Sequence, residues 1–192
     1  MIYVIISYKI IYLYEKGDIM SNITKNYIAL KMKELMKCKP IDKIRITEIC
    51  ELAEIKRPTF YYHFIDKYDL IAYIFYKDAY NTDIISVESA ALGMDKIKEN
   101  IIFYKRAYED NSQNALWTYM HSYFAKRYID IIKEKLNTKT LNYELEYSIK
   151  FYCMGAVGMT RDWALNDNIT SSLTIVKLMF NSMPEEMKKI LF

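Results

Sequence analysis

The sequence predicts an all-α protein, and two observations lead to this prediction. The 192 residues contain only 4 glycines and 3 prolines, too few for the turns of a β-rich fold or for a low-complexity linker. Apolar residues also recur at helical spacing, with charged residues between them. A chain of this length can bury a substantial core, in one elongated domain or two small ones.

The first two helices are predicted in the N-terminal third. The helical pattern starts at Thr24, and Pro40 stops it. Its apolar positions follow the spacing i, i+4, i+7 and i+8, at Ile28, Met32, Leu35 and Met36. A second, short helix is expected over residues 46–53.

The third helix is predicted to begin at Arg57, with Pro58 in its first turn, where the missing N–H costs nothing. Phe60 and Phe64 lie four residues apart and are expected to point into the core. The two tyrosines between them must then point elsewhere.

A fourth, longer helix follows, with Asp66 as its cap and Asp69 three residues later, as in a capping box. Its expected buried stripe comprises Leu70, Ile71, Ile74 and Phe75. Two short helices between two longer ones form a helix-turn-helix inside a small bundle. Further helices are expected over residues 94–109, 112–136, 141–166 and 170–191.

Residues 1–19 are predicted to be an upstream extension. The apolar run MIYVIISYKIIYLY is too short for a spanning helix and is interrupted by Lys9. It also lacks a signal peptide's basic region and cleavage site. The stretch EKGDIM can be encoded by DNA that holds a ribosome-binding sequence, so we expect translation to start at Met20. If the segment is translated, a flexible arm or a short extra helix is expected.

The spacing of the cysteines and the distribution of charge limit the possible classes of function. Cys38, Cys50 and Cys153 lie far apart, without histidines at ligand spacing, which argues against a metal site or a disulfide framework and favours the cytoplasm. The net charge is +3, yet residues 21–67 alone hold ten Lys and Arg against six Asp and Glu. A solvated face is one interpretation; nucleic-acid binding by the N-terminal third is the other.

Residues 46–75, ITEICELAEIKRPTFYYHFIDKYDLIAYIF, closely resemble the DNA-binding signature of the tetracycline-repressor (TetR/AcrR) family of bacterial transcription regulators. The pattern T-[FL]-Y-x-H-F-x-x-K-x-x-L is matched at Thr59, Phe60, Tyr61, His63, Phe64, Lys67 and Leu70. The match covers about residues 22–75. Together with GAVGMTRDWAL and LMFNSMPEEMK nearer the C-terminus, it resembles the branch of dihydroxyacetone-kinase-type regulators.

The resemblance implies a helix-turn-helix DNA-binding domain over residues 20–66, and a helical regulatory and dimerisation domain over residues 67–192 that the fourth helix connects to it. It implies a homodimer on a palindromic operator of double-stranded DNA, most often a repressor, released by an unknown small-molecule effector or partner protein. No cofactor, metal or membrane is expected.

Two positions depart from the family pattern. Glu54 stands where the family usually has glycine, in a turn where a positive φ is convenient. Arg45 stands where a Ser or Thr cap is expected, and Thr47 is the alternative cap.

The third helix is expected to enter a major groove. Lys56, Arg57 and Thr59 are the candidates for base edges. Phosphate contacts are expected from its tyrosines and histidine, and Lys67 is expected to form a phosphate cradle with the amides at the start of the fourth helix. The full candidate set is Arg45, Thr47, Lys56, Arg57, Pro58, Thr59, Tyr61, Tyr62, His63 and Lys67. Plain packing with exposed hydroxyls is the alternative for the tyrosines, and a bond to a carbonyl for the histidine.

Two further sets are expected in the C-terminal part. The candidate effector pocket comprises Phe103, Tyr104, Trp117, Met120, His121, Phe124 and Tyr152. The alternative for its aromatics is ordinary helical core. The candidate dimer interface comprises Tyr152, Gly155, Met159, Leu173, Val176 and Phe180, because small residues let another helix approach closely.

Three classes of function were compared. A DNA-binding regulator is the first interpretation. A co-regulator that responds to a partner protein, such as an activator, is the alternative. An enzyme is not supported, since the sequence has no Gly-rich phosphate loop and its two histidines lie in no acid–base or nucleophile arrangement.

Overall fold

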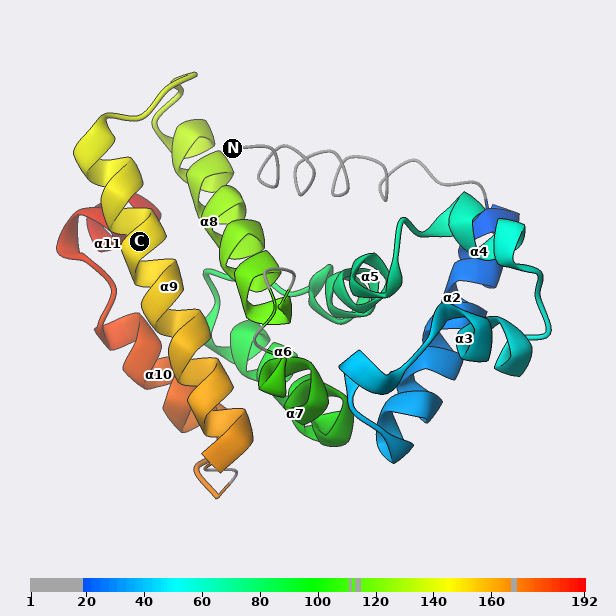
Figure 1. The fold of residues 1–192 in the computed structure, drawn as a ribbon. Coiled ribbons are helices and arrows are strands. Elements are labelled where there is room, and N and C mark those ends of the chain that lie inside the picture. Colours follow the sequence, from blue (N-terminus) through cyan, green and yellow to red (C-terminus); the bar gives the residue numbers. More distant parts are fainter. Residues whose placement is uncertain (1–18, 111, 113–114, 167–168) are drawn as a thin grey trace. The chain divides into compact units, whose positions relative to one another are not determined.

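A computed structural model describes residues 19–110, 112, 115–166 and 169–192. Every regular element in these residues is a helix, which confirms the all-α prediction (Figure 1). The expected extension, apart from Ile19, lies outside the described residues. None of the described helices combines the length and the apolar character that crossing a membrane requires.

The described chain forms two compact units. The first comprises the residues up to Lys77 together with 102–119, and the second comprises 78–101 together with 120–192. The units therefore divide the chain differently from the expected segments 20–66 and 67–192, since a later helix packs with the N-terminal ones.

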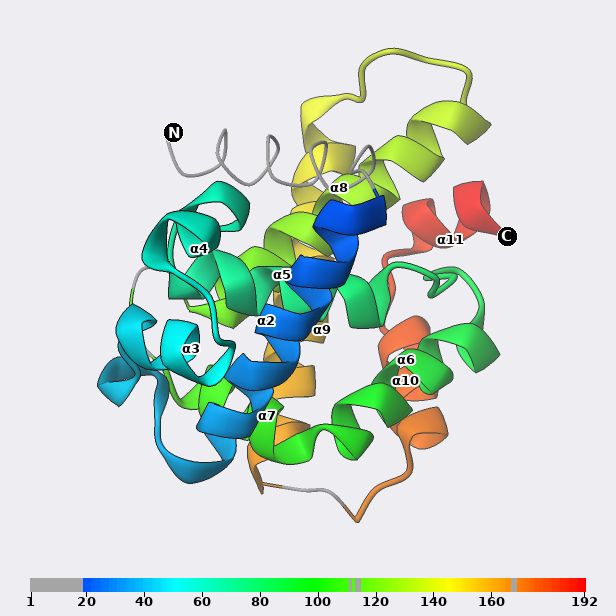
Figure 2. The same ribbon diagram turned by 90° about the vertical axis from the view of Figure 1, so that its right-hand side faces the viewer.

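The first unit contains the predicted helix-turn-helix. Its elements are α2 (Ile19–Cys38), the 3-10 helix η1 (Ile41–Lys43), α3 (Ile46–Leu52), α4 (Arg57–His63), most of α5 (Lys67–Ala79) and α7 (Ile101–Glu109). The short helices α3 and α4 pack on α2, as Figures 1 and 2 show. Among the fully buried side chains at this junction are Ile28, Met32, Ile49, Phe60 and Phe64.

The second unit contains α6 (Val87–Glu99), most of α8 (Leu116–Lys135), α9 (Tyr143–Asn166), α10 (Ser172–Asn181) and α11 (Glu185–Leu191). Helices α8 and α9 lie side by side and share a core with α11. That core includes Tyr128, Ile132, Ile149, Cys153 and Met187.

The caps predicted around the fourth helix are present. Asp66 accepts hydrogen bonds from the amides of Tyr68 and Asp69, both at 2.8 Å, and the Asp69 carboxylate accepts one from the Ile65 amide at 2.9 Å. These bonds satisfy amides that have no partner inside the helix. The third helix also begins at Arg57, with Pro58 in its first turn, as predicted.

Two of the helix predictions are wrong, because each predicted range is divided into two helices in the structure. The helix expected over 94–109 begins earlier, at Val87, and ends at the C-cap Asn100, whose backbone amide and side-chain amide both donate to the Lys96 carbonyl at 3.1 Å. The helix expected over 170–191 breaks between Ser182 and Pro184, since proline cannot continue the hydrogen-bond ladder.

The turn between α3 and α4 is a Schellman motif. The Ile55 amide donates to the Cys50 carbonyl at 3.0 Å, and the Glu54 amide donates to the Glu51 carbonyl at 3.2 Å. Glu54 has a φ of 52°, in the left-handed region that favours glycine. The departure noted in the sequence is therefore a strained residue in the turn that orients α4.

The three cysteines differ in exposure. Cys38, at the end of α2, is exposed, whereas Cys50 and Cys153 are buried. Burial raises the pKa of the Cys50 thiol, and it raises that of Cys153 to about 12. A buried neutral thiol is a poor nucleophile.

Candidate nucleic-acid interface

Helix α4 has one buried face and one exposed face. Phe60 and Phe64 are buried, with ring centroids 5.7 Å apart, and they anchor the helix in the first unit. Tyr61 and Tyr62 are 47% and 79% exposed. The expectation that the phenylalanines point inward and the tyrosines outward is therefore confirmed.

The exposed face of α4 carries the candidate base-reading residues. Arg57 and Tyr61 lie one turn apart, and an Arg57 Nη atom donates to the Tyr61 hydroxyl at 3.3 Å. The guanidinium also lies 5.8 Å from the centre of the tyrosine ring. The bond to Tyr61 raises the pKa of Arg57, so the side chain stays charged. The Tyr61 oxygen is the acceptor, which leaves its own O–H available to a phosphate.

His63 ends α4 on a half-buried face. Its Nδ1 atom is buried and has no hydrogen-bond partner among the described residues. Burial lowers the pKa of His63, and the nearby charge of Lys25 lowers it further. The ring is therefore neutral at pH 7, so its exposed part can offer a hydrogen bond without adding charge.

The start of α3 places its two candidates at the surface. Arg45 and Thr47 are both exposed. Arg45 is the cap residue, and Glu48 accepts from its amide at 2.8 Å. Glu48 also forms an ion pair with Lys39, and these two hydrogen bonds lower the pKa of its carboxyl. Thr47 lies inside the first turn, so it is not the cap.

The remaining candidates around α4 are Lys56 and Pro58, both exposed, and Thr59, which is partly buried. Lys56 occupies the cap position and Pro58 the first turn. Lys67, the first residue of α5, has its ammonium against backbone carbonyls of the loop that contains η1. Of the ten candidates, seven are therefore exposed and three, Thr59, His63 and Lys67, are partly buried.

The seven candidate effector residues are divided between the two units. Phe103, Tyr104 and Trp117 belong to the first, and Met120, His121, Phe124 and Tyr152 to the second. Phe103, Tyr104, Met120 and Tyr152 are buried, Trp117 is exposed, and His121 and Phe124 are partly buried. His121 Nε2 lies 3.1 Å from the Lys150 carbonyl, a contact between α8 and α9.

The six candidate dimer residues are also divided, by burial. Tyr152 and Val176 are buried inside the second unit, and the Tyr152 hydroxyl donates to the Met179 carbonyl at 3.2 Å. Both are core residues, Tyr152 on α9 and Val176 on α10. The spacing of apolar residues did not reveal this for Tyr152, because α9 has apolar side chains on both faces. Met159 and Leu173 are exposed, as is Gly155, whereas Phe180 is partly buried.

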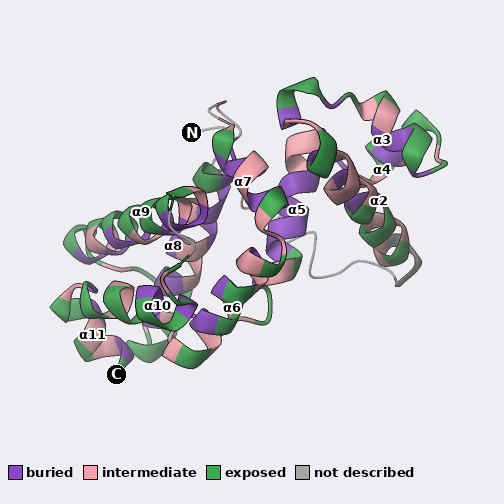
Figure 3. Cartoon of the chain, turned by 90° about the horizontal axis from the view of Figure 1, so that it is seen from below, coloured by how far each residue is buried: buried purple, intermediate pink, exposed green. Residues whose placement is uncertain are grey.

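An exposed apolar stripe runs along α9, where exposed and buried residues alternate (Figure 3). Tyr147, Phe151 and Met154 follow at helical spacing and are 58%, 69% and 56% exposed. Gly155 and Gly158 lie beside them, and a Cβ atom on either would meet no described atom within 4 Å. Sequence analysis missed Tyr147 and Met154 for this surface, although a helix with two apolar faces is a signal for it.

Two family models match the chain. One, described as "Bacterial regulatory proteins, tetR family", matches residues 33–74, and the other, "Transcriptional regulator C-terminal region", matches residues 92–185. A curated relative is the "HTH-type dhaKLM operon transcriptional activator DhaS" of Lactococcus lactis subsp. lactis (strain IL1403), 31% identical over 94 residues. That alignment covers 46% of this chain, and this chain spans only half the length of the relative.

Two solved structures share the fold. "Dihydroxyacetone kinase operon activator DhaS" superimposes with a TM-score of 0.57 at 20% identity, over 87% of this chain and 97% of the other. A "tetR-family transcriptional regulator from Streptomyces coelicolor" gives 0.53 at 15% identity, over 92% and 88%. Both family models describe transcription regulators, and the two solved structures show a similar fold.

Proposed function

The chain belongs to the TetR family of bacterial regulatory proteins, and on this basis we propose that it acts as a homodimer that recognises a palindromic operator on double-stranded DNA. Family membership makes it a DNA-binding transcription regulator and not an enzyme. The observation that carries the proposal is the division of α4 into buried Phe60 and Phe64 and exposed Arg57, Tyr61 and Tyr62.

In the proposed complex, α4 lies in the major groove with its N-terminal residues at base edges. Lys56, Arg57 and Thr59 read bases, because Arg takes guanine with two hydrogen bonds and a Thr methyl meets thymine. Tyr61 and Tyr62 donate to phosphates and fix the register, together with the His63 ring. Arg45 and Thr47 reach the backbone from the start of α3, while Pro58 presets the entry of α4.

The proposed dimer contact uses α9 and α10. One helix-turn-helix reads too little sequence, and a two-fold dimer reads two half-sites about 34 Å apart. Glycines inside a helix cost about 1 kcal/mol each relative to alanine, yet nothing in the described chain occupies the space beside Gly155 and Gly158. The exposed stripe on α9 supports a second copy of the chain as the partner that approaches there.

Control is proposed to act through the second unit, where a bound effector favours dimers whose two α4 helices no longer match the groove spacing. Met120 and Tyr152 are the buried candidates in that unit. In this proposal the regulator represses its target and is released by the effector.

A second candidate is an activator that answers to a partner protein. The specific observation in its favour is that the curated relative is named an operon transcriptional activator. A transcriptional reporter fused to the bound promoter separates the two signs of regulation: deleting the regulator raises expression from a repressed promoter and lowers it from an activated one.

The test of the function itself is footprinting of the purified chain on the DNA upstream of its own gene, with a scrambled duplex of equal length as the control. We expect a symmetric protected site on the DNA. The affinity should fall steeply as the salt concentration rises. Equal affinity for both duplexes contradicts sequence-specific recognition, and no binding to either at low salt contradicts the function as a whole.

A further inference from the structure

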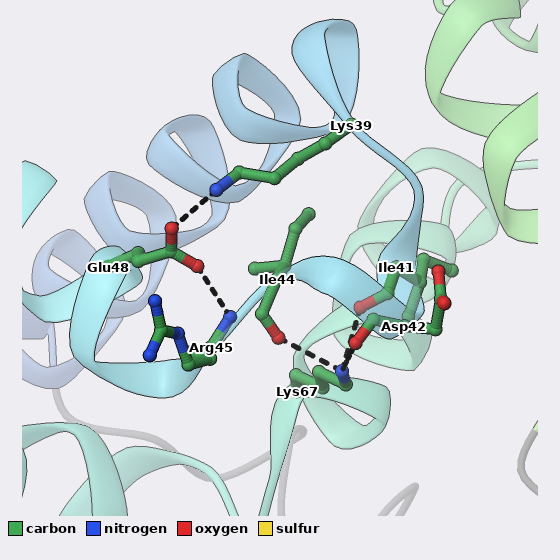
Figure 4. Close-up of polar contacts among 7 residues, drawn as sticks. All are labelled: Lys39, Ile41, Asp42, Ile44, Arg45, Glu48 and Lys67. Atoms are coloured by element: carbon green, nitrogen blue, oxygen red, sulfur yellow. Dashed lines mark hydrogen bonds and ion pairs between the residues drawn. The ribbon is translucent and has the colours of Figure 1, made fainter.

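The ammonium of Lys67 lies on three backbone carbonyls (Figure 4). Nζ donates to the carbonyl of Ile41 at 2.7 Å, to that of Ile44 at 2.9 Å and to that of Asp42 at 3.4 Å. These carbonyls are more than 20 residues away in sequence. They belong to η1 and the residue that follows it, in the loop that joins α2 to α3.

The number of bonds matters, because a lysine ammonium has three N–H donors and no acceptor. Three carbonyls use all three donors. The last carbonyls of a helix have no partner inside it, and a cation is favoured at that end. Lys67 thus bonds carbonyls of η1 and its C-cap, of which the Ile41 carbonyl also accepts from the Ile44 amide at 3.0 Å. All three donors of its ammonium have partners in the free chain, so a phosphate contact would require one of these bonds to break.

The amides beside Lys67 are also occupied. Asp66 accepts from the amides of Tyr68 and Asp69, both at 2.8 Å, at the N-terminus of α5. A phosphate at this helix end would have to replace the Asp66 carboxylate or lie against its negative charge. Both parts of the phosphate cradle expected from the sequence therefore already have partners within the chain.

The loop held by Lys67 leads directly into the helix-turn-helix. Ile41 and Ile44 are buried, so their side chains anchor the loop in the first unit while their carbonyls face Lys67. On the other side, Glu48 links Lys39 to the Arg45 amide and fixes the start of α3. Since α3 packs on α4, the position of this loop determines the position of the candidate base-reading helix.

We infer that Lys67 is a positioning residue: it ties the start of α5 to the 41–44 loop and so holds α3 and α4 in the orientation that reads DNA, without contacting a phosphate itself. This inference rests on the proposed DNA-binding function.

The experiment compares full-length Lys67→Met with wild type and with Arg45→Met, which removes an exposed cation that the proposal places at the DNA backbone. Each protein is titrated with the footprinted upstream duplex and with a scrambled duplex, between about 50 and 200 mM salt. Lys67→Met should lower the ratio of specific to scrambled affinity about tenfold and keep the wild-type salt slope. Arg45→Met should reduce the slope by about 0.9, as expected when one phosphate contact is lost.

A salt slope reduced by about 0.9 in Lys67→Met, with an unchanged affinity ratio, would overturn the inference, because that result marks a phosphate contact. A loss of stability alone, with both the slope and the ratio unchanged, would overturn it too. The affinity ratio separates positioning from a merely structural role, since it is measured on the folded protein.

A second measurement needs no variant. Lysine acetylation of the free wild-type chain, followed by mass spectrometry, should show slow modification of Lys67 and fast modification of Lys56. Fast modification of Lys67 in the free protein would contradict the bonds between its ammonium and the three carbonyls. This readout stands even if wild type binds neither duplex, so failure of the inference is distinguishable from failure of the proposed function.

Discussion

Arg57 and Tyr61 are joined across one turn of α4 by a hydrogen bond of 3.3 Å, with the guanidinium 5.8 Å from the ring centre. Both side chains lie on the exposed face of the helix, and the tyrosine oxygen accepts. The two residues therefore present a charged fork and a free O–H group in a fixed relationship before DNA binds.

Replacing Tyr61 with phenylalanine should weaken binding by about tenfold on any duplex, because one hydrogen bond to a charged phosphate is lost. The affinity ratio between specific and scrambled DNA should stay unchanged. Fluorescence anisotropy with both duplexes measures this. Tyr80→Phe, which changes an exposed tyrosine of the second unit, is the matched control and should bind like wild type. A loss confined to the specific duplex would assign Tyr61 to base reading instead.

Arg57→Lys keeps the charge and removes the planar fork. We expect an unchanged salt slope and a loss of about 1–3 kcal/mol of discrimination at one base pair of each half-site. Affinities for a series of singly substituted operators locate that base pair. If Arg57→Lys weakens all operators equally, Arg57 contacts the backbone and not a base.

Glu54→Gly should stabilise the protein by about 1 kcal/mol. A left-handed residue with a side chain costs about 1–2 kcal/mol, and the extra backbone freedom of glycine in the unfolded chain offsets part of that gain. Urea titration gives the free energy of unfolding. Glu54→Ala is the control, since it removes the carboxylate but keeps the Cβ atom, and it should give no such gain. Equal stabilisation by both variants would point to charge and not to φ.

The stability of the protein should fall as the pH decreases from about 6.5. Burial, aided by Lys25, lowers the pKa of His63 in the folded state, so below the unfolded value the unfolded chain binds more protons. The stabilisation is thus fully present above about pH 6.5 and is lost as the pH falls through the folded pKa. Free energies of unfolding at a series of pH values measure it.

The control for His63 is His63→Gln, which should remove most of this acid-side loss. Identical profiles for wild type and His63→Gln would contradict the assignment.

Gly158→Leu should dissociate the proposed homodimer, because the leucine fills the space in which the partner helix is proposed to approach. The fold of the protomer should survive, since an added Cβ meets no described atom within 4 Å. Light scattering after size-exclusion chromatography gives the mass. Lys139→Leu, at an exposed position in the α8–α9 loop, adds the same side chain elsewhere and should leave the dimer intact. A wild-type monomer at micromolar concentration rules out the dimer.

Local chemistry made the helix-turn-helix predictable from the sequence. Pro58, the pair Phe60 and Phe64, and the caps Asp66 and Asp69 act within one or two turns, so their spacing in sequence determines their placement. The positive φ of the turn was likewise expected from the family pattern at Glu54.

Relationships over longer distances were not predictable. The carbonyl partners of Lys67 lie more than 20 residues away, and no spacing rule brings them to its ammonium. Tyr152 was expected both in the effector pocket and at the dimer interface. It is buried, because α9 packs against α8 with one of its two apolar faces. Helix α6 ends at Asn100 with a side-chain bond to the Lys96 carbonyl, which the spacing of apolar residues does not indicate.

The exposure of Cys38, beside two buried thiols, gives experimenters a labelling handle that needs no engineering. A maleimide spin label or dye should attach at the end of α2 alone, in the unit that carries α4. In a two-fold assembly each copy then carries one probe. The distance between the two probes reports the distance between the two units that contain α4. Pulsed spectroscopy or energy transfer could follow that separation while metabolites are screened.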